Sequence, residues 1–156
     1  MDKILAACLM LAAQTYSVPP AVLVGIQQVE GGTVGQAVGP NQNGSYDLGP
    51  MQINTLWVPV MAEKWGVSNN TALRWIKDDP CTNMGVAAWI LRGHMDETGN
   101  LAQSIAHYHS RTPRFGGPYK GKVVTAMRSK GLIRDEATRL KDKSMKLPIK
   151  WRYPLL

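Results

Sequence analysis

One glutamate stands at the end of an apolar run, where a carboxyl group could act as an acid. Glu30 closes the run AVLVGIQQVE and is the only acidic residue between Asp2 and Asp47. Leu23, Ile26 and Glu30 have i, i+3, i+7 spacing, so in a helix the carboxyl lies on the apolar face. Burial and the negative end of the helix macrodipole both disfavour its charged form. A carboxyl that keeps its proton near neutral pH can protonate a leaving oxygen. The alternative is an ordinary surface Glu at a helix end.

A polar loop at 44–54, GSYDLGPMQIN, contains the groups that a saccharide site needs. Glycosidases usually use two carboxyl groups, and Asp47 is the candidate for the second. Gly49 permits a tight turn, and the side-chain amides of Gln52 and Asn54 can bind sugar hydroxyl and acetamide groups. Taken singly, each of these residues is also typical of a turn or a polar surface.

Two other kinds of site are not expected. The segment AHYHS contains Tyr108, His109 and Ser110, but no serine lies in a GxSxG motif, so a hydrolase triad is disfavoured. His107 and His109 are two residues apart and therefore face different sides of a helix, with no cysteine or acidic partner at ligand spacing. The sequence therefore predicts neither a metal site nor a cofactor.

Helical periodicity predicts a mainly α domain around these groups. We expect helices over about 4–16, 20–30, 51–66, 71–76, 79–98, 101–110 and 119–133, and a Gly-rich loop or small hairpin over 33–50. Gly31 and Gly32 should end the second helix, and Asn70, Asp79 and Asn100 are the expected N-caps of later ones. The segment RTPRFGGP, 111–118, is expected to be a loop.

The N-terminal stretch MDKILAACLMLAA has two interpretations. It could be a short signal peptide, or it could be a helix of the folded domain. The helix is favoured, because these apolar residues fall on one face: Ile4, Leu5, Cys8, Leu11 and Ala12. An export signal would then lie outside these 156 residues. No apolar run reaches the roughly 18 residues of a membrane span.

The two cysteines, Cys8 and Cys81, leave two alternatives open. They could form a disulfide in an exported protein, or they could be two buried thiols. Two cysteines in a chain of this length do not define a compartment.

Three segments in order resemble the catalytic domain of lytic transglycosylases of the soluble-lytic-transglycosylase type. They are YSVPPAVLVGIQQVEGG, DLGPMQIN and IAHYHS, and the similarity covers about residues 12–132. The resemblance implies a lysozyme-like α-helical fold. It also implies cleavage of the glycan of bacterial peptidoglycan, by a protein that is periplasmic or exported.

The resemblance assigns roles residue by residue. Glu30 matches the catalytic glutamate, and Tyr108 matches the tyrosine that approaches it. Gly49, Met51 and Gln52 match the family's G-x-M-Q segment, which lines the saccharide groove. The complete set of expected substrate-binding residues is Ser45, Asp47, Gly49, Met51, Gln52, Tyr108 and His109.

The chain departs from the family at three positions. Gly31 stands where the family commonly has Ser, Pro50 where it has Leu, and His109 where it has Asn. This variant resembles the specialised transglycosylases that accompany conjugation and type IV secretion machinery, so proteins of such machinery are possible partners.

The mechanism implied by the family needs one principal carboxyl. Glu30 would protonate the glycosidic oxygen between MurNAc and GlcNAc, with help from the MurNAc acetamide. It would then take the proton of the MurNAc C6 hydroxyl, which closes a 1,6-anhydro ring. Asp47 would then order its loop, whereas a catalytic Asp47 would favour lysozyme-like hydrolysis. A peptidoglycan-binding module without activity is the remaining alternative.

Positive charge is concentrated at the C-terminal end. Residues 120–156 contain 11 Lys or Arg against three Asp or Glu, and the rest of the chain contains seven against eight. We therefore expect a domain over 1–133 and a basic tail over 134–156. The tail could contact anionic wall polymer, dock a secretion partner or simply be solvated. Nucleic-acid binding is not expected, because no known binding fold is visible.

Overall fold

The computed structural model describes residues 1–133, and the basic tail expected over 134–156 lies outside the described residues. The described chain is mainly α-helical, as the sequence predicts. Its elements are α1 (Lys3–Tyr16), α2 (Pro20–Glu30), β1 (Ala37–Val38), β2 (Asp47–Leu48), β3 (Ile53–Asn54), the 3₁₀ helix η1 (Thr55–Trp57), α3 (Val58–Trp65), α4 (Asn69–Asp78), α5 (Pro80–Thr98), α6 (Leu101–His109) and α7 (Pro113–Ser129). Among the described residues, no helix is both long and apolar enough to cross a membrane.

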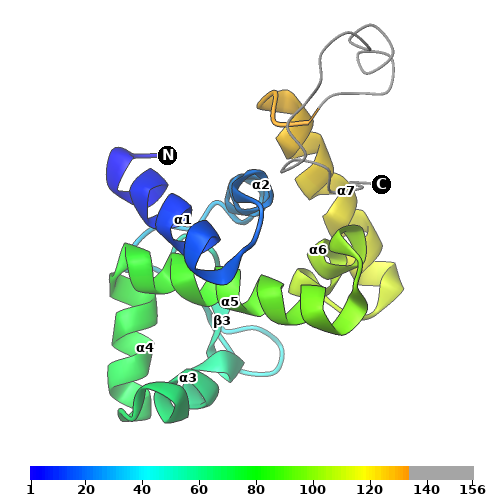
Figure 1. The fold of residues 1–156 in the computed structure, drawn as a ribbon. Helices are drawn as coiled ribbons and strands as arrows, with labels where there is room; N and C mark the ends of the chain where they lie inside the picture. The colour runs from blue at the N-terminus through cyan, green and yellow to red at the C-terminus, as the bar shows by residue number, and fades with distance from the viewer. Residues whose placement is uncertain (134–156) are drawn as a thin grey trace, which may run out of the picture.

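The long helix α5 runs through the middle of the molecule (Figure 1). Helices α1, α4 and α6 pack against it, while α7 packs on α6 and α2. Its interior face is mostly apolar, and Met84, Ala88 and Leu91 are fully buried. The expected N-cap, Asp79, accepts a hydrogen bond from Thr82 N. The helix expected over 79–98 and its N-cap are therefore confirmed.

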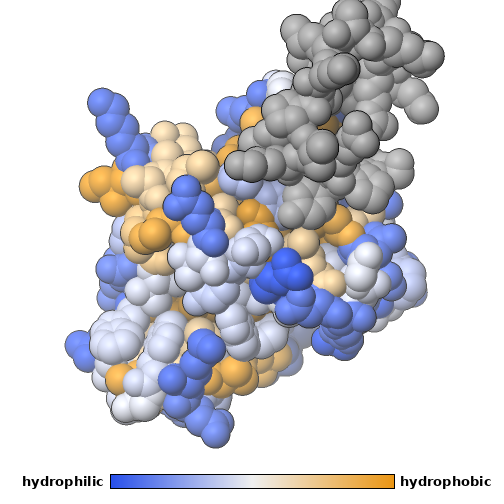
Figure 2. All heavy atoms as spheres, in the orientation of Figure 1, coloured by the Kyte–Doolittle hydropathy of each residue, from blue (hydrophilic) through white to orange (hydrophobic). Residues whose placement is uncertain are grey.

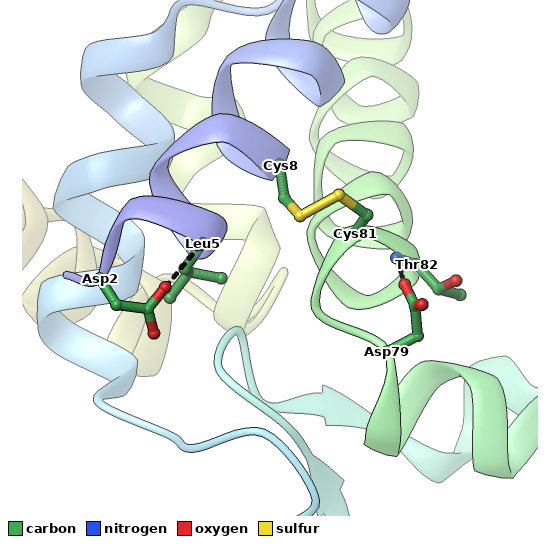
Figure 3. Close-up of a disulfide and its surroundings, with 6 residues drawn as sticks. All are labelled: Asp2, Leu5, Cys8, Asp79, Cys81 and Thr82. Atoms are coloured by element: carbon green, nitrogen blue, oxygen red, sulfur yellow. Dashed lines mark hydrogen bonds between the residues drawn. A yellow bond between two sulfur atoms is a disulfide. The ribbon is translucent and has the colours of Figure 1, made fainter.

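Helix α1 belongs to the core, and a disulfide joins it to the start of α5. Cys8 and Cys81 are bonded and lie 73 positions apart in sequence (Figure 3). Leu5, Cys8 and Ala12 are buried as expected, but Ile4 and Leu11 are exposed, because the helix turns Leu9 and Ala13 inward instead. Hydrophobic residues, coloured orange, accordingly cluster on the surface of α1 at the upper left of Figure 2.

The Gly-rich segment forms a small antiparallel sheet with strand order β1-β2-β3. Asp47 pairs with Asn54, and Leu48 with Ile53, so the turn between β2 and β3 contains residues 49–52. The expected helix over 51–66 is therefore wrong in its first part. Gln52 has a φ of 50°, which no helix accommodates, and α3 begins only at Val58. Pro59 sits in the first turn of α3, where its missing N–H costs nothing.

Two other expected boundaries are also wrong. Ser68, not Asn70, caps α4, by accepting a hydrogen bond from Thr71 N. The expected loop over 111–118 is helical from Pro113 onward. Gly116 in this segment allows close packing, since a Cβ at this position would lie 2.4 Å from Ser110 O. In RTPRFGGP, Pro113 thus starts a helix, and Gly116 lets this helix pack closely against the end of α6.

Candidate active site

Glu30 is the last residue of α2, as the sequence predicts. Leu23 and Ile26 on its face are fully buried, and the helix ends at Gly31, which has a φ of 60°. The Glu30 side chain is half-buried. The pKa of Glu30 is raised to about 7, chiefly by burial. A hydrogen bond from Tyr119 acts to lower it, and the charge of Asp47 acts to raise it. Near neutral pH this carboxyl is therefore poised between acid and base.

Tyr119 of α7 contacts the carboxyl directly. Its Oη donates a hydrogen bond of 2.7 Å to Glu30 Oε1. The Tyr119 ring is buried and stacks on His109, with centroids 4.8 Å apart. Burial and the neighbouring Glu30 raise the pKa of the Tyr119 hydroxyl far above its usual range. The phenol therefore keeps its proton near neutral pH and can donate to Glu30.

Tyr108 has a different partner from the one its family match suggests. Its Oη donates to Met51 O at 3.0 Å, whereas the hydrogen bond to Glu30 comes from Tyr119. Burial raises the pKa of the Tyr108 hydroxyl well above its usual range, and the charge of Glu30 raises it further. This influence indicates that Tyr108 also lies near Glu30. The sequence places Tyr119 only at the start of the helix expected over 119–133, on the same face as the apolar Val123 and Met127. A polar hydroxyl on that face is the signal that could have identified it.

The carboxylate of Asp47 is held from two sides. Its Oδ2 accepts from Asn41 Nδ2 at 3.2 Å, and its Oδ1 accepts from Asn54 Nδ2 at 3.0 Å. Ser45 Oγ accepts from the same two amides and donates to Asn43 Oδ1. The side chain of Ser45 is therefore occupied in ordering the loop, and the network fixes a negative charge near Glu30.

The G-x-M-Q turn, residues 49–52, is held in place by a buried side chain that the sequence did not single out. Asn83 of α5 is fully buried, and its amide donates to Leu48 O at 2.8 Å and Ile76 O at 3.0 Å. Its Oδ1 accepts from Met51 N at 2.9 Å. Gly49 has a φ of 65°, and a Cβ there would lie 2.4 Å from Asn83 Nδ2.

Gly49 and Met51 are buried and do not line the open cleft. The Met51 side chain is fully buried, and a role of these two residues in the substrate groove stays a prediction. Gln52 does line the cleft, and its Nε2 donates to Gly49 O at 2.9 Å. A Cβ on Gly32 would lie 2.0 Å from Gly49 O. Only glycine at position 32 lets this turn approach the end of α2.

An open cleft of about 860 Å³ brings the candidate residues together. Glu30, Ser45, Asp47, Gln52, Tyr108 and His109 all line it. One part of its wall is apolar and contains Ile53, Leu56, Trp57 and Ile90, and another is polar and contains His94, His107, Ser110 and Arg111. Polar groups around a half-buried acid, with an apolar surface beside them, are suited to a saccharide.

The neighbouring side chains do not suggest a metal centre. Within residues 1–133, no group of three or more His, Cys, Asp or Glu side chains is arranged to hold a metal ion. The His94 and His107 rings meet edge to face, with centroids 5.8 Å apart. Among the described residues, the chemistry of the cleft thus centres on Glu30.

Comparison with known proteins agrees with the geometry. Residues 7–115 match the family described as "Transglycosylase SLT domain". The chain is 32% identical over 105 residues to "Invasion protein IagB" of Salmonella typhimurium, covering 67% of this chain and 62% of that protein. It is 31% identical over 101 residues to "Protein IpgF" of Shigella flexneri, covering 65% and 63%.

A third relative is "Peptidoglycan-binding-like protein" of Escherichia coli O157:H7, 28% identical over 109 residues, with 67% and 64% covered. The matched region thus spans less than two thirds of the length of each of these relatives. The family match covers more than half of the chain, including Glu30, the 44–54 loop and α6. The chain therefore belongs to the transglycosylase SLT domain family, whose fold is lysozyme-like and mainly α.

Proposed function

We propose that this protein is a peptidoglycan lytic transglycosylase that cleaves the β-1,4 bond between MurNAc and GlcNAc. One observation carries the proposal: a half-buried Glu30, with its pKa raised to about 7, lines a cleft large enough for several sugar rings. Membership of the SLT family supports the same reaction. Such a carboxyl can serve first as an acid and then as a base at one pH.

In the proposed first step, Glu30 gives its proton to the glycosidic oxygen as the bond from that oxygen to MurNAc C1 breaks. The leaving GlcNAc departs with a free hydroxyl, and positive charge develops at C1. The MurNAc acetamide oxygen assists from within the substrate. The hydrogen bond from Tyr119 and the loss of the proton leave a stabilised Glu30 carboxylate.

In the second step, the Glu30 carboxylate takes the proton of the MurNAc C6 hydroxyl while O6 bonds to C1. This closes the 1,6-anhydro ring and restores the protonated acid, so no water is consumed. The fixed carboxylate of Asp47 contributes a negative charge near the developing positive charge. Asp47 thereby acts electrostatically and needs to form no bond to the sugar.

Hydrolysis is the second candidate, and Asp47 is the observation that favours it. An ordered carboxylate opposite a protonated Glu is the arrangement that retaining glycosidases use. The mass of the product separates the two reactions. Digestion of purified sacculi followed by mass spectrometry should yield chain ends lighter by one water than reducing ends. Reducing ends alone would overturn the transglycosylase proposal in favour of hydrolysis.

We further propose that the protein acts outside the cytoplasm and opens the wall locally for an envelope-spanning secretion or conjugation assembly. The substrate lies there, and the Cys8–Cys81 disulfide is of a kind that persists in oxidising compartments. Similarity to proteins named for invasion supports the link to such an assembly. Deleting the gene in its host should reduce assembly or transfer, and restoring a Glu30→Gln copy should not rescue it.

A further inference from the structure

The polar wall of the cleft contains a positive charge that the proposed reaction does not use. Arg111 lies between α6 and α7 and is the only Lys or Arg among the described residues that line the cleft. Its side chain is 65% exposed, so it is open to a ligand. Burial lowers the pKa of His94, and the Arg111 charge lowers it further, so the neutral form of that imidazole is favoured while Arg111 keeps its charge.

Arg111 is anchored yet retains hydrogen-bonding capacity. Its Nη1 and Nη2 donate to the two carboxylate oxygens of Glu97, at 2.7 Å and 3.0 Å. A guanidinium has five N–H donors, so three have no partner in the part of the chain that the structure describes. Glu97 itself does not line the cleft. The ion pair therefore fixes the position of the Arg111 guanidinium at the cleft without occupying the cleft itself. The remaining N–H donors of Arg111 are available to a second acceptor.

His107 offers a second donor on the same wall. Its Nδ1 is buried without a hydrogen-bond partner within residues 1–133. A buried N–H without an acceptor is costly, so the favoured tautomer carries its proton on Nε2. Nε2 is not buried in this way, and the residue lines the cleft. The cleft lining therefore includes an imidazole as well as a guanidinium, and both residues lie near enough to His94 to lower its pKa.

We propose that Arg111, assisted by His107, binds a carboxylate of the substrate. A guanidinium with free N–H groups on an exposed wall recognises carboxylates by charge-assisted hydrogen bonds. The proposal rests on the proposed function, because it takes the ligand to be peptidoglycan. In that polymer the carboxylate has two sources: the stem peptide, or the lactyl group of MurNAc where the peptide has been removed. A chitin oligosaccharide has neither.

Binding without turnover tests this directly. In a Glu30→Gln background, affinities would be measured for chitotetraose, for a peptide-free glycan tetrasaccharide and for a peptide-bearing one. Adding Arg111→Gln should weaken binding of carboxylate-bearing ligands by about three- to tenfold, as expected for one partly exposed charged contact. Chitotetraose binding should not change. A loss confined to the peptide-bearing ligand would assign the stem peptide. A loss confined to the peptide-free ligand would assign the lactyl carboxylate, which is an amide wherever the peptide is attached. A loss for both would show that Arg111 binds either carboxylate.

Two further variants separate recognition from structure. Glu97→Gln weakens the anchor but keeps the Arg111 charge and an amide oxygen that can accept one hydrogen bond, so affinity for carboxylate-bearing ligands should fall by less than in Arg111→Gln. Arg111→Lys should restore part of the affinity that Arg111→Gln loses. Equal losses for Arg111→Gln and Glu97→Gln, an equal loss for chitotetraose, or no loss for any ligand would overturn the proposal. Failure of the proposed function would show separately, as unaltered sacculi after treatment with the unmodified protein.

Discussion

Tyr119 Oη donates a 2.7 Å hydrogen bond to Glu30 Oε1, and this bond joins α7 to the end of α2 across 89 positions in sequence. It acts on the Glu30 pKa in the opposite direction to burial and to the charge of Asp47. The acid is thus balanced between a phenol that favours its charged form and surroundings that favour its neutral form. The sign of each influence can be tested separately.

Replacing Tyr119 by Phe removes the hydrogen bond that favours the carboxylate. We expect the pKa of Glu30 to rise above about 7, so the fall of kcat/KM at alkaline pH should begin at higher pH than in the wild type. The rate at the optimum should drop by about tenfold through loss of one hydrogen bond to a charged group. Tyr108→Phe is the matched control, because it loses a bond to Met51 O instead. A shift of the alkaline limb in the control but not in Tyr119→Phe would contradict the assignment.

Replacing Asp47 by Asn should move the same limb the other way. The charge of Asp47 raises the pKa of Glu30, so its removal should lower that pKa and start the alkaline fall at lower pH. Loss of the electrostatic contribution should also lower kcat, by about 10- to 100-fold. The pH profile of kcat/KM on soluble glycan measures both effects. An unchanged profile would show that Asp47 serves only to order its loop.

Asn83 should be as important for folding as Glu30 is for chemistry. Asn83→Ala leaves Met51 N, Leu48 O and Ile76 O without their buried partner. The free energy of unfolding in urea should fall by about 2–4 kcal/mol. Asn70→Ala, on the exposed face of α4, is the control and should change it by less than about 0.5 kcal/mol. Equal effects of the two variants would refute the anchoring role.

Reduction of the disulfide should affect stability more than activity. Cys8 and Cys81 are 73 residues apart in sequence, so opening this loop should cost about 4 kcal/mol. Neither residue lines the cleft, so activity at low temperature should persist. Thermal unfolding with and without a reductant measures the effect, and a Cys8→Ser, Cys81→Ser double variant should be insensitive to the reductant. A melting temperature that reduction leaves unchanged would contradict this stabilising role.

Much of this architecture could be predicted from local sequence. Helical periodicity located α1, α2, α5 and α6, since each has a continuous apolar face and a cap or glycine at an end. The element boundaries failed where tertiary contacts override local preference. Gly116 and the prolines of 111–118 are typical of a loop, yet close contact with α6 makes them helical.

A site residue could be predicted where its own type and local sequence indicate its role. It could not be predicted where its role depends on a contact with a residue far away in the sequence. Glu30 was identified because a carboxyl on an apolar helix face is unusual. Asn83 and Tyr119 lie 32 residues from Met51 and 89 from Glu30, their respective partners. No local pattern reports such pairing. The family match likewise named Tyr108 but could not show which hydroxyl reaches the acid.

The central claim is that the Glu30 carboxyl performs the cleavage, and clearing of purified sacculi by Glu30→Gln tests it most directly. The amide preserves the shape of the side chain but has no proton to transfer at neutral pH. With a melting temperature at least equal to that of the wild type, the variant should clear sacculi at least about 100-fold more slowly. Clearing by a folded Glu30→Gln protein at the wild-type rate would contradict the account.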